Sequence, residues 1–425
     1  MHQQLMWVTI SLVLISNLIT YSKTRDWFNP VMILSITFFL PLVASLLRLS
    51  ALQRLNWHNS TYVLIFEVLV VWLLFPTVII AFSPGYRHNA LVSGMSRHLA
   101  KMESSTVTRM ARLISLTVIF AFLLSNYLQT NSLIPWFGSY KDSLHVEYVQ
   151  GLRMVARAIP FASSILLVLY MKTKRKLDLI LFGILVLLPL SRGARIDTFF
   201  AILAAVIIIG IMLRKIRTRF VLFGGMILVV GVMLLALMGN IRASKFGLYE
   251  FDYAKSIAFV PNPGPLNTFA ILYGYFALPF ENFDIFVRTN LGHRTFGLAS
   301  LEWLFVGFLK LNLFFPGLED SYRTINLFQP ISGASTVATG LVPFFLDFGV
   351  VGAWVLMGVY MSSWLFLYRR SRLSVSYMVL YALVSASFAL SCFQPIVTSP
   401  YLFYQLLYTL LFFRVVSVIR IPRDK

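Results

Sequence analysis

Two arginines lie at the tip of an apolar hairpin, where their charge could do chemistry. The tip, residues 191–197, reads SRGARID. As helices, the arms from Lys176 to Arg192 and from Arg195 to Arg214 would be about 24 Å and about 28 Å long, which barely crosses a hydrocarbon core about 30 Å thick. An arginine facing lipid at that depth costs at least ~2.5–3.5 kcal/mol. We therefore predict that Arg192 and Arg195 line an outward-facing polar cavity and bind an anion.

Other polar side chains are predicted at a similar depth, each near the outer end of an apolar segment. Asp347 lies in the stretch PFFLDFG, where Pro343 and Gly349 can interrupt a helix. A carboxylate can accept a proton from a reacting hydroxyl, so Asp347 is the first candidate for a general base, or for a group that orients one. The other predicted cavity residues are Glu67, Asn126 and Asp197.

The long segment 240–340 is rich in groups that bind anions and sugars. Arginine can form two parallel bonds to phosphate oxygens, which lysine does less well. The candidate phosphate ligands are Arg242, Arg288, Arg294 and Arg323, and the candidate residues for stacking on sugars are Tyr273, Tyr275, Trp303 and Tyr322. His293 is a second candidate for the base.

Several kinds of chemistry are excluded or disfavoured by the sequence. The chain has no HExxH, GxSxG or phosphate-loop motif and no DxD-like motif. Its single cysteine, Cys392, excludes a disulfide framework and a CxxC metal or redox site. We therefore expect chemistry that needs no metal ion, nucleotide or other cofactor.

The elements that must position these residues are membrane helices. Of the 425 residues, 58% are hydrophobic and 12% are charged, whereas soluble domains carry about a quarter charged residues. The formal net charge is +20. In a soluble protein such an excess would suggest nucleic acid, but the apolar runs are long enough to span a bilayer. We predict an all-α polytopic membrane protein that binds no nucleic acid.

Eleven spans are predicted, with basic clusters at 172–176, 214–219 and 369–372 on the cytoplasmic side. The predicted spans are 5–21, 28–47, 61–82, 113–131, 156–171, 178–190, 197–213, 220–239, 341–368, 373–393 and 398–418. The N-terminus is then outside and the C-terminus inside, and most of the excess positive charge serves topology.

Three regions follow from this assignment. Residues 1–239 hold eight spans with short loops, residues 240–340 form a large outer loop, and residues 341–425 hold three spans and an inner tail. The apolar stretches 268–280 and 301–315 in the loop are either interfacial or re-entrant helices, or one further pair of spans, which would give up to thirteen.

The layout resembles the O-antigen polymerases, the Wzy-type polymerases of oligosaccharide repeat units in bacterial envelopes. The resemblance rests on the SRGAR motif at 191–195, the long outer loop, and the stretch 343–352 with DFGVVG at 347–352. The family's Arg-x10-Gly pattern is missing, because Arg323 and Gly333 are separated by nine residues.

The resemblance implies a lipid-linked glycosyltransferase of the bacterial inner membrane, with a GT-C-like helical fold and an active site that faces the periplasm. Its substrates would be a donor and an acceptor glycan on undecaprenyl diphosphate, in contact with membrane lipid, and a chain-length regulator protein is an expected partner. Arg192 and Arg195 would then hold the donor diphosphate, with an arginine of the loop closing from above.

Three other interpretations remain. An O-antigen ligase would share the arginine-bearing cavity and the large loop. A flippase or polysaccharide transporter would be expected to show repeated halves and a midplane site, and neither is visible in the sequence. A membrane O-acyltransferase would need a histidine deep in a span, and no histidine lies inside a predicted one.

Overall fold

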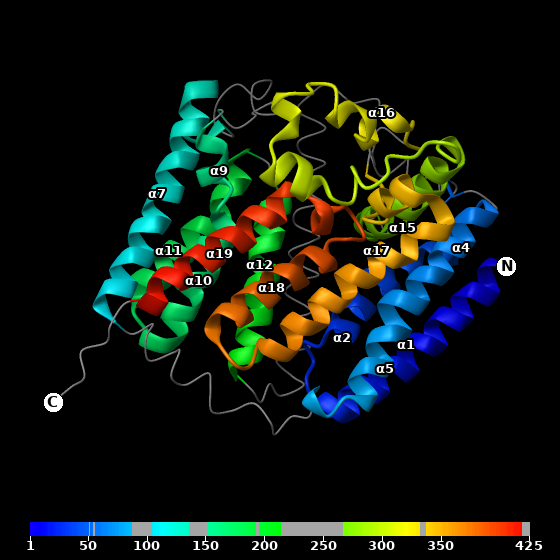
Figure 1. Cartoon of the computed structure of the whole chain (residues 1–425), viewed down its shortest axis with the longest axis horizontal. Helices are drawn as coiled ribbons and strands as arrows, with labels where there is room; N and C mark the ends of the chain where they lie inside the picture. The colour runs from blue at the N-terminus through cyan, green and yellow to red at the C-terminus, as the bar shows by residue number, and fades with distance from the viewer. Residues whose placement is uncertain are drawn as a thin grey trace. The chain divides into compact units, whose positions relative to one another are not determined.

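The computed structural model describes residues 1–50, 52–53, 56–86, 104–135, 149, 151–192, 195–213, 267–331 and 337–418. The regular elements among these residues are all helices, and no strand occurs in this part of the chain (Figure 1). Eight of the helices are long and apolar enough to cross a membrane. The prediction of an all-α polytopic membrane protein is confirmed in this form.

Eight of the predicted spans correspond to these helices. They are α1 (His2–Thr24), Pro30–Leu47, Asn59–Phe82, α7 (Ser105–Thr130), Leu152–Thr173, α12 (Arg195–Leu213), α17 (Val342–Arg370) and α19 (Pro400–Val418). The predicted span 178–190 overlaps the shorter helix α11 (Lys176–Leu187), and the predicted span 373–393 contains the shorter helix α18 (Val375–Ala389). The predicted span 220–239 lies outside the described residues, so the number eleven stays a prediction.

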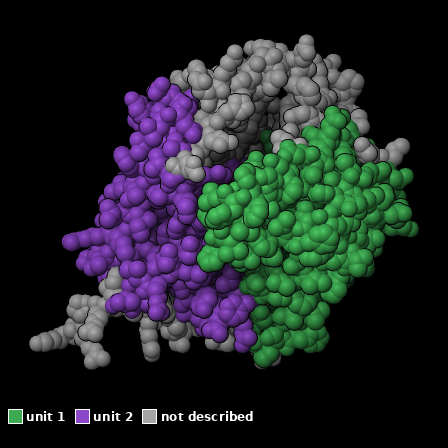
Figure 2. Space-filling model, turned by 45° about the horizontal axis from the view of Figure 1, so that its top comes forward, with its two compact units in different colours: residues 1–88, 215–365, 388–400 green, residues 89–214, 366–387, 401–425 purple. Residues whose placement is uncertain are grey.

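Packing divides the chain into two compact units, coloured separately in Figure 2. Unit 1 comprises residues 1–88, 215–365 and 388–400, and unit 2 comprises residues 89–214, 366–387 and 401–425. Each unit combines three segments that are far apart in the sequence, because its helices pack against helices that are not their neighbours along the chain. Each unit is described by itself.

Two spans of unit 1 contain a π-helical turn that leads up to a proline. In Pro30–Leu47, the π-turn η1 (Ser35–Phe39) joins α2 (Pro30–Leu34) to α3 (Leu40–Leu47). In Asn59–Phe82, the π-turn η2 (Leu69–Leu74) joins α4 (Asn59–Val68) to α5 (Phe75–Phe82). Pro41 and Pro76 follow these turns. Proline lacks an N–H and its ring clashes with the carbonyl four residues earlier, so a wider turn accommodates it.

Helix α15 (Asn267–Thr289) of unit 1 lies across the ends of two spans and is not itself among the candidate spans. Ser45, near the end of α3, donates to the Ala277 carbonyl at 3.2 Å, and Thr61, in the first turn of α4, donates to Asp284 at 2.8 Å. The predicted apolar stretch 268–280 is thus the first part of a longer helix. The second part of that helix carries the buried polar residues Glu281, Asn282 and Asp284.

Helix α17 folds back at Gly349, whose φ of 66° and ψ of −157° are not helical. Phe344 and Tyr360 have ring centroids 5.5 Å apart, although a straight helix would separate these positions by about 24 Å. The predicted interruption near Asp347 is therefore present, at the glycine. Phe344 also contacts Trp72, at 6.4 Å between centroids, near the midpoint of Asn59–Phe82.

Unit 2 is built around α10 (Ile159–Thr173), which packs against α7, α11 and α12. The short helix α9 (Leu152–Ala156) leads into α10, and the 3-10 turn η6 (Leu188–Arg192) extends α11. At one end of the unit, Arg112 forms an ion pair with the buried Asp178 at 2.7 Å. At the other end, Asn126 donates to the Ser191 hydroxyl at 3.4 Å. Each contact joins two helix ends that would lie on the same side of the membrane if successive spans alternate in direction.

We expect Gly349→Ala to lower the stability of the folded chain by about 1–3 kcal/mol, because this backbone conformation is accessible almost only to glycine. An added Cβ would also lie 2.5 Å from Nη2 of Arg294. The matched control is Gly358→Ala in the same helix, where nothing lies within 4 Å of the added Cβ. Thermal unfolding of both variants in detergent would be compared. An equal melting temperature for the two would contradict the fold-back at Gly349.

Candidate functional site

Arg192 is held in unit 2 by an amide and an aromatic ring. Its side chain is 6% exposed at the end of η6, its Nε donates to the Asn126 side-chain oxygen, and its guanidinium lies 4.5 Å from the centre of the Phe122 ring. Asn126 is fixed in turn, because its amide nitrogen donates to the Leu133 carbonyl at 2.8 Å. Two predicted site residues, Arg192 and Asn126, therefore meet, and Asn126 fixes the orientation of the guanidinium.

The rest of the predicted arginine site is described only in part. Asp197 lies in the first turn of α12 and is 9% exposed. Arg195 begins α12, and its side chain lies outside what the structure describes, as does the whole of Arg242. Glu67 and Asp347 belong to unit 1, whereas Asn126, Arg192 and Asp197 belong to unit 2. The single cavity predicted from these five residues therefore remains a prediction.

Asp347 is fully buried and occupied by hydrogen bonds from one segment of chain. Thr295 Oγ1 donates to Oδ1 at 2.5 Å and the Ala299 N–H donates to it at 3.1 Å. Both the N–H of Ser300, at 2.7 Å, and its hydroxyl donate to Oδ2. A carboxylate held in this way ties residues 295–300 to α17, and each of its oxygens already accepts two hydrogen bonds. Its role as a base is not supported by this geometry.

Arg294 and His293 lie just after α15 and bind backbone carbonyls. Arg294 donates to the carbonyl of His293 at 2.5 Å and to that of Leu291 at 2.8 Å, so it caps the chain that leaves the helix. Its guanidinium also lies 5.2 Å from the centre of the Phe345 ring. His293 Nε2 is 2.9 Å from the Ser321 carbonyl. Since a carbonyl only accepts, Nε2 carries the hydrogen and Nδ1 is left as an acceptor.

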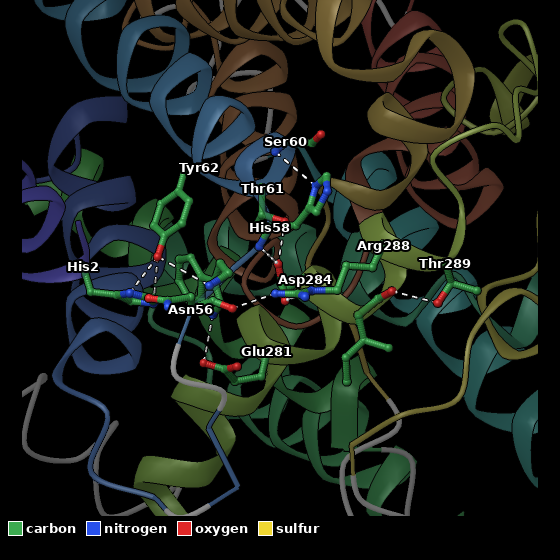
Figure 3. Close-up of polar contacts among 12 residues, drawn as sticks. His2, Asn56, His58, Ser60, Thr61, Tyr62, Glu281, Asp284, Arg288 and Thr289 are labelled. Carbon is green, nitrogen blue, oxygen red and sulfur yellow. Dashed lines mark hydrogen bonds and ion pairs between the residues drawn. The ribbon is translucent and has the colours of Figure 1, made fainter.

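A second polar cluster, shown in Figure 3, surrounds the buried half of α15. Asp284 is fully buried and accepts hydrogen bonds from the His58 N–H at 2.6 Å, from Thr61, and from Arg288 Nε at 2.7 Å. Arg288 also donates to the Asn56 carbonyl at 2.6 Å. Glu281, one turn earlier, accepts from the Trp57 indole at 3.0 Å.

The predicted stacking aromatics are engaged within the protein. The Tyr273 hydroxyl donates to Gln53 at 2.6 Å, and burial raises the pKa of Tyr273 to about 12. Burial likewise raises the pKa of Tyr322, whose hydroxyl has no hydrogen-bond partner among the described residues. The Trp303 indole donates to Tyr360 at 2.9 Å, and Tyr275 is half-buried in α15. A glycan-binding role for these residues stays a prediction.

Glu67 and Arg323 differ in exposure. Glu67 is half-buried in α4, and its buried Oε2 has no hydrogen-bond partner among the described residues, whereas Arg323 is exposed. Arg323 forms an ion pair with Glu319, one helical turn earlier, and that hydrogen bond raises the pKa of Arg323. Among the residues that the structure describes, no group of three or more His, Cys, Asp and Glu side chains could hold a metal ion.

The sequence indicated Glu281 and Asp284 only as possible proton acceptors of the loop, and their burial on one face of α15 was not predicted. Glu281, Asn282 and Asp284 are all fully buried, and Asn282 binds Val337 and Ile331 across the loop. The available signal was the close succession of three polar residues directly after an apolar stretch. Comparison with protein-family models, with curated proteins and with solved structures finds no match in any of the three.

We expect Arg288→Ala to destabilise the chain by about 1–3 kcal/mol, because it removes a charged donor from the fully buried Asp284. Arg323→Ala is the matched control. It breaks an ion pair of the same spacing whose arginine is 55% exposed, and such pairs contribute at most about 1 kcal/mol. Thermal unfolding compares the two variants. A loss from Arg323→Ala that equals the loss from Arg288→Ala would refute the structural role of Arg288.

Asp347→Asn should also destabilise the chain by about 1–3 kcal/mol, because an amide NH₂ would face the N–H of Ser300 or Ala299. The variant Asp347→Ala tests the same hub by removing all four hydrogen bonds. Both variants should unfold at lower temperature than the wild-type chain. If Asp347→Asn unfolds at the wild-type temperature but is inactive in the polymerisation assay described below, Asp347 acts in catalysis and the structural interpretation fails.

Proposed function

We propose that this protein is a polymerase that joins oligosaccharide repeat units carried on undecaprenyl diphosphate, at the periplasmic face of a bacterial inner membrane. In this reaction, the bond between the donor sugar and its diphosphate breaks, and a hydroxyl of the acceptor unit takes the glycan. The hydroxyl proton goes to a base. The released undecaprenyl diphosphate carries the negative charge that builds up as the bond breaks.

The observation that supports this proposal best is the buried Arg192 in the end of an apolar hairpin. A cation fixed before the reaction stabilises charge that develops on a leaving diphosphate, and it does so most strongly where water is excluded. Asn126 and Phe122 hold the guanidinium in one orientation, so little reorganisation is needed. Arg288 and Arg323 each form an ion pair with a carboxylate one helical turn earlier, which ties their charge to the local fold.

Of the two candidate bases, which both belong to unit 1, His293 has the geometry that better fits a base. Its Nε2–H is held by the Ser321 carbonyl, which leaves Nδ1 with a lone pair that can accept a proton. Asp347 takes a positioning role, because its oxygens hold residues 295–300, directly after His293. This assignment reverses the order of preference that sequence reasoning gave.

The direct test uses purified full-length protein and a synthetic repeat unit on undecaprenyl diphosphate, with no nucleotide sugar. A polymerase produces a ladder of products on a gel, and the ladder should persist with a chelator present. Transfer of a finished chain to a lipid A core, without a ladder, would assign the protein as an O-antigen ligase instead. Movement of the lipid-linked unit across a vesicle membrane without any new bond would assign it as a flippase.

Arg192→Ala should lower the rate of ladder formation by about 100-fold to 1,000-fold, the usual effect of removing one donor to developing charge. Arg192→Lys should also lose most of the activity, because lysine cannot form the two-pronged contact of a guanidinium. The control is Arg112→Lys, which keeps the charge of the ion pair with Asp178 in the same unit and should stay within about twofold. A normally folded Arg192→Ala protein that still forms long chains would rule out the diphosphate role.

A further inference from the structure

We infer that residues 303–315 form a re-entrant element that inserts its apolar side chains into the lipid acyl chains beside α17. This inference does not depend on the proposed enzymatic function. It concerns a part of unit 1 that the long outer loop would place in water by sequence order alone. The sequence left open whether the stretch 301–315 is interfacial, re-entrant or spanning.

The depth of this element follows from a chain of side-chain contacts that starts at the middle of a span. Trp72 lies near the midpoint of the spanning helix Asn59–Phe82, and its ring centroid is 6.4 Å from that of Phe344. Phe344 is in turn 5.5 Å from Tyr360. Together these two distances are shorter than half of a hydrocarbon core about 30 Å thick. The ring of Tyr360 therefore lies within the core, in whichever direction the contacts run.

Tyr360 holds the start of the element at this depth. Its hydroxyl donates to the Ser300 carbonyl at 2.6 Å and accepts from the Trp303 indole at 2.9 Å. Ser300 is fixed on its other side by Asp347. The segment from Ser300 to Trp303 is therefore bonded to α17 at Asp347 and at Tyr360, and it lies at the depth of the hydrocarbon core.

The backbone of the element is hydrogen-bonded within itself, as a bilayer requires. The π-helical turn η8 (Trp303–Phe308) and the 3-10 turn η9 (Leu311–Leu313) make up most of it. Between and after them, the N–H groups of Leu309, Phe314 and Phe315 bond to carbonyls of the same segment, at 2.8–3.0 Å. Pro316 has no N–H to satisfy.

The side chains that this backbone presents outward are large and apolar. Their exposed fractions are 64% for Phe308, 46% for Leu309, 65% for Leu313, 73% for Phe314 and 60% for Phe315. Contiguous exposure of this kind marks an interaction surface in a soluble region and a lipid contact in a membrane. The polar side chains among residues 308–315 are Lys310 and Asn312, and the Asn312 amide donates to Glu319 at 3.0 Å.

We expect lipid to cover the exposed side chains of residues 308–315, because they continue the exposed apolar face of α17. Val351, Val355 and Val359 recur every four residues on one face of α17 and are 82%, 49% and 56% exposed, which is the pattern of a helix face in contact with acyl chains. Tyr360, to which Trp303 is bonded, follows Val359 directly. The exposed apolar side chains of residues 308–315 extend this lipid-facing surface from a spanning helix onto the loop.

The test uses the full-length chain in liposomes made from purified protein and phospholipid at a high lipid-to-protein ratio. The only native cysteine, Cys392, is buried, so the wild-type chain gives the background of labelling by a charged, membrane-impermeant maleimide. Single cysteines are introduced as Phe314→Cys and Phe315→Cys. The control Asp320→Cys is exposed a few residues away in the same loop, and Val355→Cys reports the lipid-facing side of α17.

We expect Asp320→Cys to react with the charged maleimide, and Phe314→Cys and Phe315→Cys to react at least tenfold more slowly, as Val355→Cys does. Size-exclusion profiles confirm that each variant is folded before reconstitution. Labelling of Phe314→Cys at the rate of Asp320→Cys would overturn the inference. Protection in native membranes but not in these liposomes would point to a partner protein, and protection lost on dilution with lipid would point to a second copy; either result also overturns it.

Discussion

A polar group that leaves water is stable only where the protein supplies its hydrogen-bond partners, and this constraint organises unit 1. Asp347 takes its donors from residues 295–300, and Asp284 takes its donors from residues 58–61 and from Arg288. Each carboxylate thereby joins a helix to a segment far away in the sequence. Once these bonds form, α15 must cross the ends of α3 and α4, and the turn after α15 must lie against the fold-back of α17.

The same constraint separates the arginines into two groups. Arg288 and Arg323 follow a carboxylate by one helical turn and are bonded to it, so their charge serves the local fold. Arg192 contacts an amide oxygen and an aromatic ring, which fix the orientation of its guanidinium. An arginine held in one orientation is suited to bind an anion, because a preorganised cation needs little reorganisation when negative charge develops beside it.

Apolar runs and helix breakers are local signals, and what depends on them could be predicted. The spans of unit 1 and the interruption at Gly349 follow from composition and from one glycine. The extension of α15 through Glu281 could not be predicted, because two of the donors to this buried carboxylate, Trp57 and Gln53, lie more than two hundred residues earlier. For the same reason, the sequence suggested Asp347 as a base or a group that orients one, since nothing near it in the sequence reveals the donors of Thr295 and Ser300.

The fold-back of α17 explains why a buried carboxylate and an exposed apolar segment occur together. Asp347 fixes Ser300 just before the break at Gly349, and Tyr360 fixes the same residue from beyond it. A chain bound at both points must run along α17 and cannot leave into water at once. Its next residues then meet the surroundings of that helix, and phenylalanine and leucine are stable there only if those surroundings are apolar. The polar hub and the lipid contact are thus two consequences of one bend in the backbone.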